Sequence, residues 1–93
     1  MPHGMRLTAF LLISMLAAGQ APPGVEEVLR QGSALVAAGK VAEAQNLYTT
    51  ALIRFPENPR LHYELGMIYL RQHDWTKAVV NYRSSLHSDP SNL

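Results

Sequence analysis

The sequence contains no cysteine, and its charges have no dominant sign. Without cysteine among the 93 residues, the chain can form no disulfide bond, no thiolate metal site and no lipid-modified N-terminal cysteine. Lys and Arg number 8 against 7 Asp and Glu, so the basic surface of a nucleic-acid-binding protein is absent. We therefore expect no nucleic-acid partner.

The sequence also has few of the residue patterns that catalytic and metal sites use. Its histidines, His3, His62, His73 and His87, include no pair at the i, i+4 spacing that places two imidazoles on one helical face. It has neither a glycine-rich phosphate loop nor a coherent Ser/His/Asp arrangement. We predict that the protein is not an enzyme and binds no metal or cofactor, with Asp74 acting as a helix cap.

Long apolar runs are missing as well. The mainly apolar stretch 7–18 has 12 residues, whereas a membrane-spanning helix needs about 20. It follows a single cation, Arg6, and ends in the small residues Ala17, Ala18 and Gly19. This arrangement is typical of a secretory signal peptide.

We accordingly predict a signal peptide over residues 1–19 and a linker over residues 20–24. Cleavage after Gly19 is preferred to cleavage after Ala21, which would leave Pro22 just beyond the cut. The prediction places the protein in the periplasm or outside the cell, with no membrane contact after cleavage. The alternatives are an uncleaved N-terminal membrane anchor and an amphipathic or buried helix that belongs to the domain.

Two consecutive stretches, 25–58 and 59–92, repeat one pattern with an offset of 34 residues. The positions that are identical in both stretches are Gly32/Gly66, Ala44/Ala78, Tyr48/Tyr82, Leu52/Leu86, Pro56/Pro90 and Asn58/Asn92. Because internal repeats with such a period characterise repeat proteins, we treat the two stretches as equivalent structural units.

Apolar spacing within each stretch predicts two helices. The four expected ranges are 25–38, 41–54, 59–72 and 75–88. In the third range Leu61, Leu65 and Ile68 recur at i, i+4 and i+7, on one helical face. Asn58 is placed to cap that helix and Pro59 suits its first turn.

The two matching glycines predict close contacts between helices. Glycine inside a helix costs about 1 kcal/mol relative to alanine, so Gly32 and Gly66 indicate an approach that excludes a side chain. We expect Ala44 and Ala78 on the opposite side of these contacts. Gly39 is expected to end its helix in a left-handed conformation.

The aromatic residues at helical core positions are expected to pack in the interior. Tyr48, Tyr82 and Trp75 occupy such positions. Packing is therefore preferred to a ligand-binding cage for all three.

This pattern resembles the tetratricopeptide repeat, which has a period of 34 residues. The second stretch carries Leu65, Gly66, Tyr69, Ala78, Tyr82 and Pro90 at the family's spacing, and the first carries Gly32, Ala44, Tyr48, Ala51 and Pro56. The departures are Val28 and His62 in place of tryptophan, Gln31 before the first glycine, and Ser85 in place of a small apolar residue. The resemblance implies an all-α fold of two tandem antiparallel helix-turn-helix repeats, a fragment of an α-solenoid, behind the apolar N-terminal segment.

The resemblance also implies a concave groove lined by the first helix of each repeat. The positions that match the groove are Leu29, Ser33, Val36, Arg60, Tyr63, Met67, Leu70 and Arg71. Some family members clamp a terminal carboxylate there, but Leu29, Ser33, Tyr63, Glu64 and Met67 stand at the clamp positions, so a mixed apolar groove is expected instead. The alternative is that these residues cover the neighbouring repeat.

The function expected from these features is a non-enzymatic, exported module that binds a protein or peptide. One alternative is an N-terminal fragment of a longer protein, with further repeats or a catalytic or assembly domain downstream. Another is a homo-oligomeric structural element. We also expect the chain to be incomplete as a folding unit, because repeat arrays generally need about three units and no later helix covers Val79, Val80 and Leu86.

Overall fold

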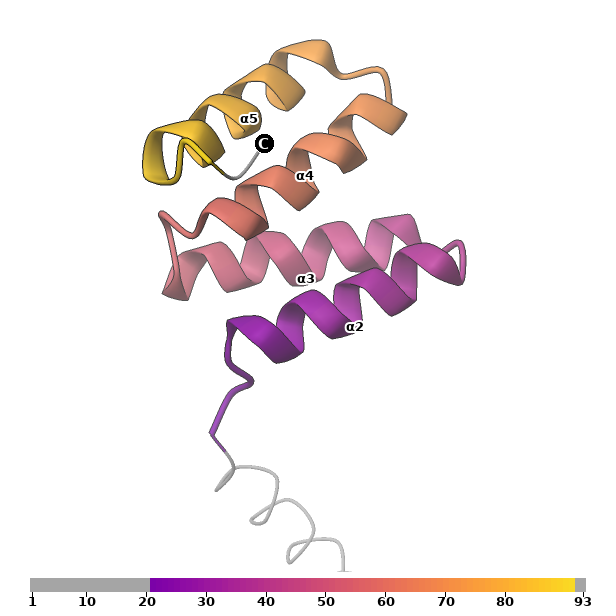
Figure 1. Cartoon of the computed structure of the whole chain (residues 1–93). Helices are drawn as coiled ribbons and strands as arrows, with labels where there is room; N and C mark the ends of the chain where they lie inside the picture. The colour runs from indigo at the N-terminus through magenta and orange to yellow at the C-terminus, as the bar shows by residue number, and fades with distance from the viewer. Residues whose placement is uncertain (1–20, 92–93) are drawn as a thin grey trace, which may run out of the picture.

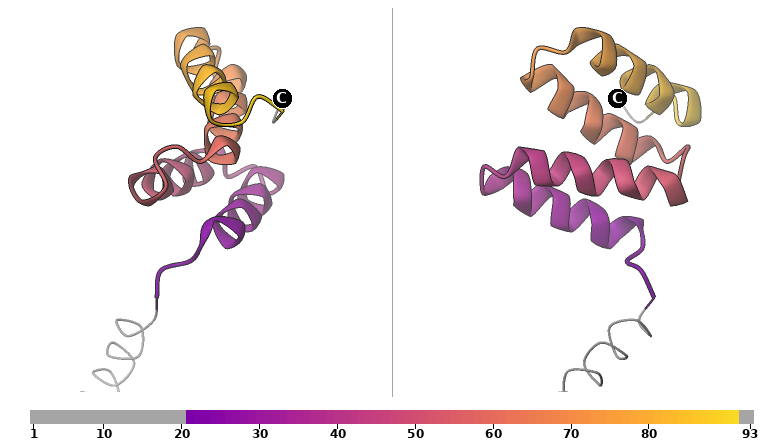
Figure 2. Two further views of the ribbon diagram at one scale, coloured as in Figure 1. Left: turned by 60° about the vertical axis from the view of Figure 1, so that its left-hand side comes forward. Right: turned by 180° about the vertical axis from the view of Figure 1, so that it is seen from behind.

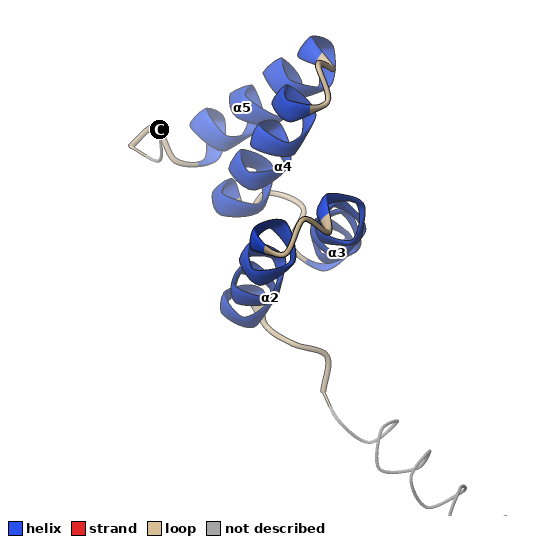
Figure 3. Ribbon diagram, turned by 90° about the vertical axis from the view of Figure 1, so that its right-hand side faces the viewer, coloured by secondary structure: helices blue, strands red, loops and turns tan. Residues whose placement is uncertain are grey.

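The computed structural model describes residues 21–91, which contain four α-helices and no β-strand (Figure 1). The helices are α2 (Val25–Ala37), α3 (Val41–Arg54), α4 (Pro59–Arg71) and α5 (Trp75–Ser88). They follow one another as two helix pairs, α2 with α3 and α4 with α5, stacked in sequence order (Figures 1 and 3). The all-α prediction is confirmed, and each helix ends within one residue of its expected range. The expected signal peptide lies outside the described residues.

Side-chain caps start both helices of the second pair. Asn58 Oδ1 accepts a hydrogen bond from the Leu61 backbone N–H at 3.1 Å, and Pro59 occupies the first turn of α4. Asp74 Oδ1 accepts from the Lys77 backbone N–H at 3.2 Å at the start of α5. Both caps were predicted, and each satisfies a backbone donor that has no partner within its helix.

The turn inside each pair has the same geometry but a different residue at its left-handed position. Gly39 has φ 79°, as expected, and His73, 34 residues later, has φ 59°. In both turns the next backbone N–H bonds back into the helix, Lys40 to Leu35 O at 2.8 Å and Asp74 to Tyr69 O at 2.9 Å. These bonds define the Schellman motif, in which a left-handed residue lets the chain satisfy the last carbonyls of a helix.

The apolar core joins the two pairs, with α3 in contact with both α2 and α4 (Figure 2). The buried cluster consists of Val28, Ala44, Tyr48, Ala51, Leu61, Leu65 and Ile68. Because three helices contribute to it, neither pair has a complete core by itself. This cluster fixes the relation between α2 and α4, the helices that carry the predicted groove residues.

The glycine positions accommodate tyrosine rings rather than alanines, which corrects the prediction for Ala44 and Ala78. A Cβ built on Gly66 would lie 2.7 Å from Tyr82 Cε1, and the nearest atoms to a Cβ on Gly32 belong to the Tyr48 ring. Each ring therefore lies directly against the backbone of the preceding helix. The two alanines are buried, but the nearest atoms at each glycine site belong to the tyrosine.

Ser85 is fully buried where the first pair has the small apolar Ala51. Its Oγ donates a hydrogen bond to the Pro59 carbonyl oxygen at 2.9 Å. A buried hydroxyl is tolerated when it is bonded in this way. The departure from the family pattern at Ser85 is thus compensated by a link between α5 and the first turn of α4.

The prediction that Trp75 packs in the interior is wrong. The residue is 56% exposed, whereas Val41, its equivalent in the first pair, packs against the core. The difference arises because α4 lies beyond α3, while no described helix lies beyond α5. For the same reason Val79 and Leu86 are exposed, as expected. Val80 is exposed as expected too, at a position whose equivalent in α3, Asn46, is also exposed.

Candidate functional site

The predicted groove residues share one face of α2 and the equivalent face of α4. Spacing of three and four residues places Leu29, Ser33 and Val36 together on α2. On α4 the corresponding positions are Arg60, Tyr63, Met67, Leu70 and Arg71. In exposure the eight residues divide into two groups. The exposed ones are Ser33, Arg60, Met67, Leu70 and Arg71, and the half-buried ones are Leu29, Val36 and Tyr63.

The half-buried members of this face have structural partners. Leu29 and Val36 pack against the buried core. The Tyr63 ring lies 5.8 Å from the Tyr82 ring, centroid to centroid, in a tilted arrangement that aromatic pairs prefer. All three side chains therefore take part in packing within the two repeats.

Met67 and Leu70 are the apolar side chains of this face that remain accessible. Met67 is 38% exposed and Leu70 is 45% exposed. They lie three residues apart, so they are neighbours on the helix surface. An apolar contact with a partner would be centred on this pair.

The charges beside Met67 and Leu70 are weakly paired or free of carboxylate partners. Arg60 Nη2 lies 3.9 Å from Glu64 Oε1, the outer limit of an ion pair, and such exposed pairs contribute about 0–1 kcal/mol. Arg71 has no ion pair with any residue of the described part of the chain. Both guanidinium groups are therefore available to an acidic partner.

The two tyrosines under this face stay uncharged. Burial raises the pKa of Tyr48, and the nearby Glu64 carboxylate raises it further. Burial also raises the pKa of Tyr82, with smaller contributions from Tyr63 and Glu64. Neither phenol can act as an anion at neutral pH, so both serve packing, as the sequence predicted.

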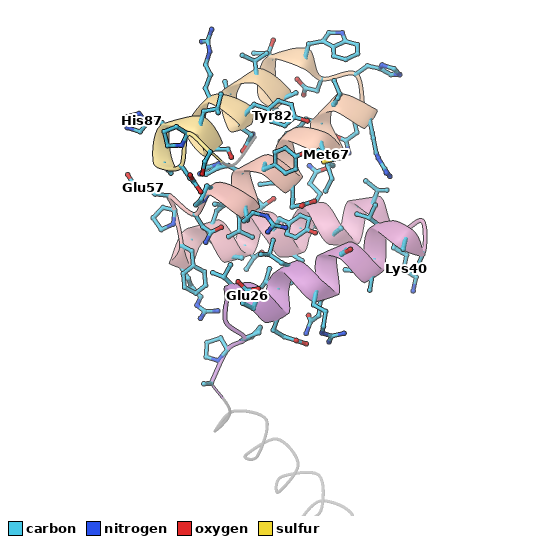
Figure 4. The ribbon with its side chains drawn as sticks, viewed as in Figure 1. Glu26, Lys40, Glu57, Met67, Tyr82 and His87 are labelled. Atoms are coloured by element: carbon cyan, nitrogen blue, oxygen red, sulfur yellow. The ribbon has the colours of Figure 1, made fainter. Side chains whose placement is uncertain are left out.

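Two surface cavities lie elsewhere, and the sequence analysis did not foresee them. The larger, about 410 Å³, is lined by Pro56, Glu57, His62, Arg83, Ser84, His87 and Ser88. The smaller, about 240 Å³, is lined by Pro22, Pro23, Val28, Leu47, Thr50, Ala51 and Arg54. Glu57 and His87 mark the larger cavity, at the end of the helices opposite Lys40 (Figure 4).

The two cavities are the same feature in successive helix pairs. Five lining positions correspond at an offset of 34 residues, Pro22/Pro56, Pro23/Glu57, Val28/His62, Thr50/Ser84 and Arg54/Ser88. The matching prolines 34 residues apart were the signal in the sequence that could have predicted the pair. The smaller cavity, in the first pair, is mainly apolar apart from Arg54. The larger cavity, in the second pair, has the ionisable side chains Glu57, His62, Arg83 and His87.

His62 helps to build the cavity of the second pair through two polar contacts of its ring. Its Nε2–H donates to the Pro56 carbonyl oxygen at 2.7 Å, and its Nδ1 lies 3.1 Å from Asn81 Oδ1. With both ring nitrogens engaged, His62 links α4 to α5 and to the preceding turn. Among residues 21–91, no group of three or more His, Asp or Glu side chains is arranged to hold a metal ion.

No helix within residues 21–91 has both the length and the apolar character needed to cross a membrane. This finding concerns the described helices alone, so the predicted N-terminal signal peptide and its localisation stay predictions.

Comparison with known proteins identifies the repeat. Residues 29–92 match the family model described as tetratricopeptide repeat, which covers both helix pairs. No curated protein matches the chain significantly. The 34-residue offset, the paired helices and the family match agree, and the chain therefore belongs to the tetratricopeptide repeat family, whose repeats are scaffolds for protein–protein interaction.

Proposed function

We propose that the protein binds an extended peptide segment of a partner through the exposed face of α2 and α4. The observation that supports this proposal is the accessible pair Met67 and Leu70, flanked by Arg60 and Arg71. Apolar contact at the centre and cationic groups at the rim fit a peptide with large apolar residues and nearby carboxylates. Ser33 provides a hydroxyl on the equivalent face of α2.

We further propose that the protein acts without catalysis and outside the cytoplasm. The proposal of export rests on the sequence of residues 1–19, with cleavage after Gly19. The intact mass of the protein recovered from the periplasm or the medium tests it. A cytoplasmic product that retains residues 1–19 would contradict export, and a membrane-bound product of full length would support the uncleaved anchor.

The peptide-binding proposal is tested with the double variant Met67→Asp, Leu70→Asp. A library of immobilised peptides is first screened with the wild-type chain, and the peptides that bind are then measured with the variant. We expect at least a tenfold loss of affinity, because each carboxylate would need desolvation in an apolar contact.

The matched control is Ile53→Asp. Ile53 is an apolar residue of α3 that is 81% exposed and lies outside the proposed face, so its substitution should leave affinity unchanged. Circular dichroism confirms that both variants fold. Equal binding by the Met67/Leu70 variant and the wild type would move the site away from this face.

A further inference from the structure

One side of α5 carries an apolar stripe that the described helices cover only in part, at Tyr82, which packs against α4. Trp75, Val79, Tyr82 and Leu86 follow at i, i+4, i+7 and i+11, which places them along one side of the helix. Tyr82 is half-buried, and the other three are exposed, Val79 by 45% and Leu86 by 41%. We call these four residues the α5 stripe. Such a row of accessible apolar side chains marks an interaction surface.

The first helix pair shows what kind of element covers this surface. Of the stripe's α3 equivalents, Val41, Tyr48 and Leu52 are buried or packed against the core. The fourth, Gln45 at the position of Val79, is half-buried and accepts a hydrogen bond from Gln72 of the turn after α4. The element that covers α3 is α4, which buries three residues against it at i, i+4 and i+7. Those residues are Leu61, Leu65 and Ile68, each at most 3% exposed. The α5 stripe therefore has the form of a docking surface for an amphipathic helix.

A second copy that packs head to tail does not fit this docking surface. The helix of a second copy that would take the place of α4 is α2, and its equivalents of Leu61, Leu65 and Ile68 are Glu27, Gln31 and Ala34. Glu27 accepts hydrogen bonds from Arg30 Nε at 2.9 Å and from Gln31 Nε2 at 3.0 Å. Burying this polar network against an apolar stripe would be costly.

The charge of α5 specifies the partner further. Between Trp75 and Ser88 there are cationic residues but neither Asp nor Glu. Arg83 lies beside the stripe, three residues before Leu86 and four after Val79, and it forms no ion pair within the described part of the chain. Two copies joined through α5 would bring like charges together, whereas an acidic helix would be attracted.

We propose that the α5 stripe binds an acidic amphipathic helix of another protein. The partner helix presents large apolar residues at i, i+4 and i+7, as α4 presents Leu61, Leu65 and Ile68 to α3. A carboxylate at its edge pairs with Arg83. This surface is separate from the Met67/Leu70 face, so the protein can hold two partners and act as an adaptor.

The test uses a synthetic helix as the partner. Its sequence is that of residues 58–72 with Arg60 and Arg71 changed to Glu, and it is held helical by a lactam bridge on the side opposite the apolar face. Trp75, the one tryptophan of the chain, lies in the stripe and reports binding through its fluorescence. We expect saturable binding with a blue shift of the Trp75 emission, because the indole becomes covered.

Three variants decide whether the peptide binds at the α5 stripe. Val79→Asp combined with Leu86→Asp should abolish binding, and Ile53→Asp should leave it unchanged. Arg83→Glu should weaken binding of the acidic peptide about tenfold and strengthen binding of the version that keeps both arginines, since about 1.4 kcal/mol corresponds to tenfold. A control peptide carrying Glu, Gln and Ala in place of its Leu, Leu and Ile should not bind.

Other results of these experiments would overturn the proposal. A concentration-dependent dimer in sedimentation that Val79→Asp disrupts would overturn the proposal in favour of a second copy. Failure of the acidic peptide to bind, or equal binding to the Val79/Leu86 variant, would also overturn it. None of these results would affect peptide binding at Met67 and Leu70, which is measured separately.

Discussion

At the scale of single residues, the glycines and tyrosines of the two repeats depend closely on each other. Each ring lies against backbone that has no Cβ, so the pair Gly66 and Tyr82 acts as one unit, as Gly32 and Tyr48 do. The glycine was visible in the sequence as a helix-breaking residue at a repeated position. The identity of its partner was not, because helical periodicity does not say which side chain of the next helix comes closest.

Gly66→Leu should lower the free energy of unfolding by about 1–3 kcal/mol, the usual cost of overpacking. Even the Cβ of the new side chain would start 2.7 Å from Tyr82 Cε1. Urea denaturation of the variant measures the loss. In a Tyr82→Ala background the same substitution should cost much less, because the ring is gone. Equal costs in both backgrounds would contradict the contact.

His73→Gly should raise the free energy of unfolding by about 0.5–1 kcal/mol. A residue with a Cβ is disfavoured at positive φ, and His73 has φ 59°, whereas glycine adopts this conformation without steric cost. The gain is measured by thermal and chemical denaturation.

The control for this prediction is His73→Ala. It removes the ring contact with Trp75, whose centroid lies 5.3 Å away, but it keeps the Cβ. We expect no gain from alanine. The reciprocal variant Gly39→Ala should destabilise by about 1 kcal/mol for conformational reasons alone, since its Cβ would meet nothing within 4 Å. Stabilisation by His73→Ala equal to that of glycine would contradict this explanation.

Glu27 provides a dependence of stability on pH. The hydrogen bond from Arg30, aided by that from Gln31, lowers the pKa of Glu27 from 4.5 to about 2. Between these values the unfolded chain binds more protons than the native one, so stability from this group rises with pH. It is complete above about pH 5 and is lost as the pH falls through about 2.

Glu27→Gln should therefore lower the melting temperature at neutral pH, and the difference from wild type should vanish near pH 2. Circular dichroism melts over that range measure it. The matched control is Glu26→Gln in the same turn, because Glu26 has no ion pair among the described residues. A difference between Glu27→Gln and wild type that does not change with pH would contradict the assignment.

At the scale of the helices, the two repeats differ in how their second helices begin. Asp74 caps α5, whereas Lys40, at the same position before α3, makes no side-chain cap. The backbone is similar at both residues, with φ −91° and ψ 80° at Asp74 and φ −95° and ψ 59° at Lys40. An aspartate at position 40 could therefore adopt the capping geometry without rearrangement.

Lys40→Asp should raise the free energy of unfolding by about 1 kcal/mol. The new carboxylate would accept from a free N–H of the first turn and would lie at the positive end of the helix dipole. Denaturation by urea measures the gain. Lys40→Asn separates the cap from the charge, because it retains most of the first effect. If Lys40→Ala stabilised equally, removal of the lysine rather than capping would be responsible.

The ends and starts of helices were the elements that the sequence predicted best. Asn58, Pro59, Asp74 and Gly39 act on the backbone within a few residues of themselves, so their roles can be inferred from local sequence. The left-handed conformation of His73 was missed, since histidine gives no such signal. Only its equivalence with Gly39 could have revealed it.

At the scale of the whole molecule, prediction from sequence failed where the outcome depends on which helices meet. Trp75 occupies a core position by periodicity but is exposed, because burial requires a neighbour that the pattern of its own helix cannot provide. Sequence spacing placed all eight predicted groove residues on one side of α2 and α4. It could not distinguish Met67 and Leu70, which remain accessible, from Leu29 and Val36, which rest on the core.

The paired cavities also belong to this scale. Each is assembled from the chain before a first helix, that helix and the following one, so its lining comes from separate stretches of the sequence. The same lining position holds Val28 in the first repeat and His62 in the second. This replacement, together with those at neighbouring lining positions, makes the first cavity mainly apolar and gives the second one hydrogen-bonding groups.

The succession of contacts, α2 with α3, α3 with α4 and α4 with α5, sets the time that folding takes. Every major interface joins helices adjacent in sequence, so only short loops must close before contacts form. Helical proteins with such local contacts fold in microseconds to milliseconds. Temperature-jump relaxation should show a dominant fast phase. Gly66→Leu should lower the ratio of the folding rate to the unfolding rate and Lys40→Asp should raise it, because one destabilises and the other stabilises the native state. A dominant phase of seconds would mean that assembly waits for a distant contact, which this order of helices does not require.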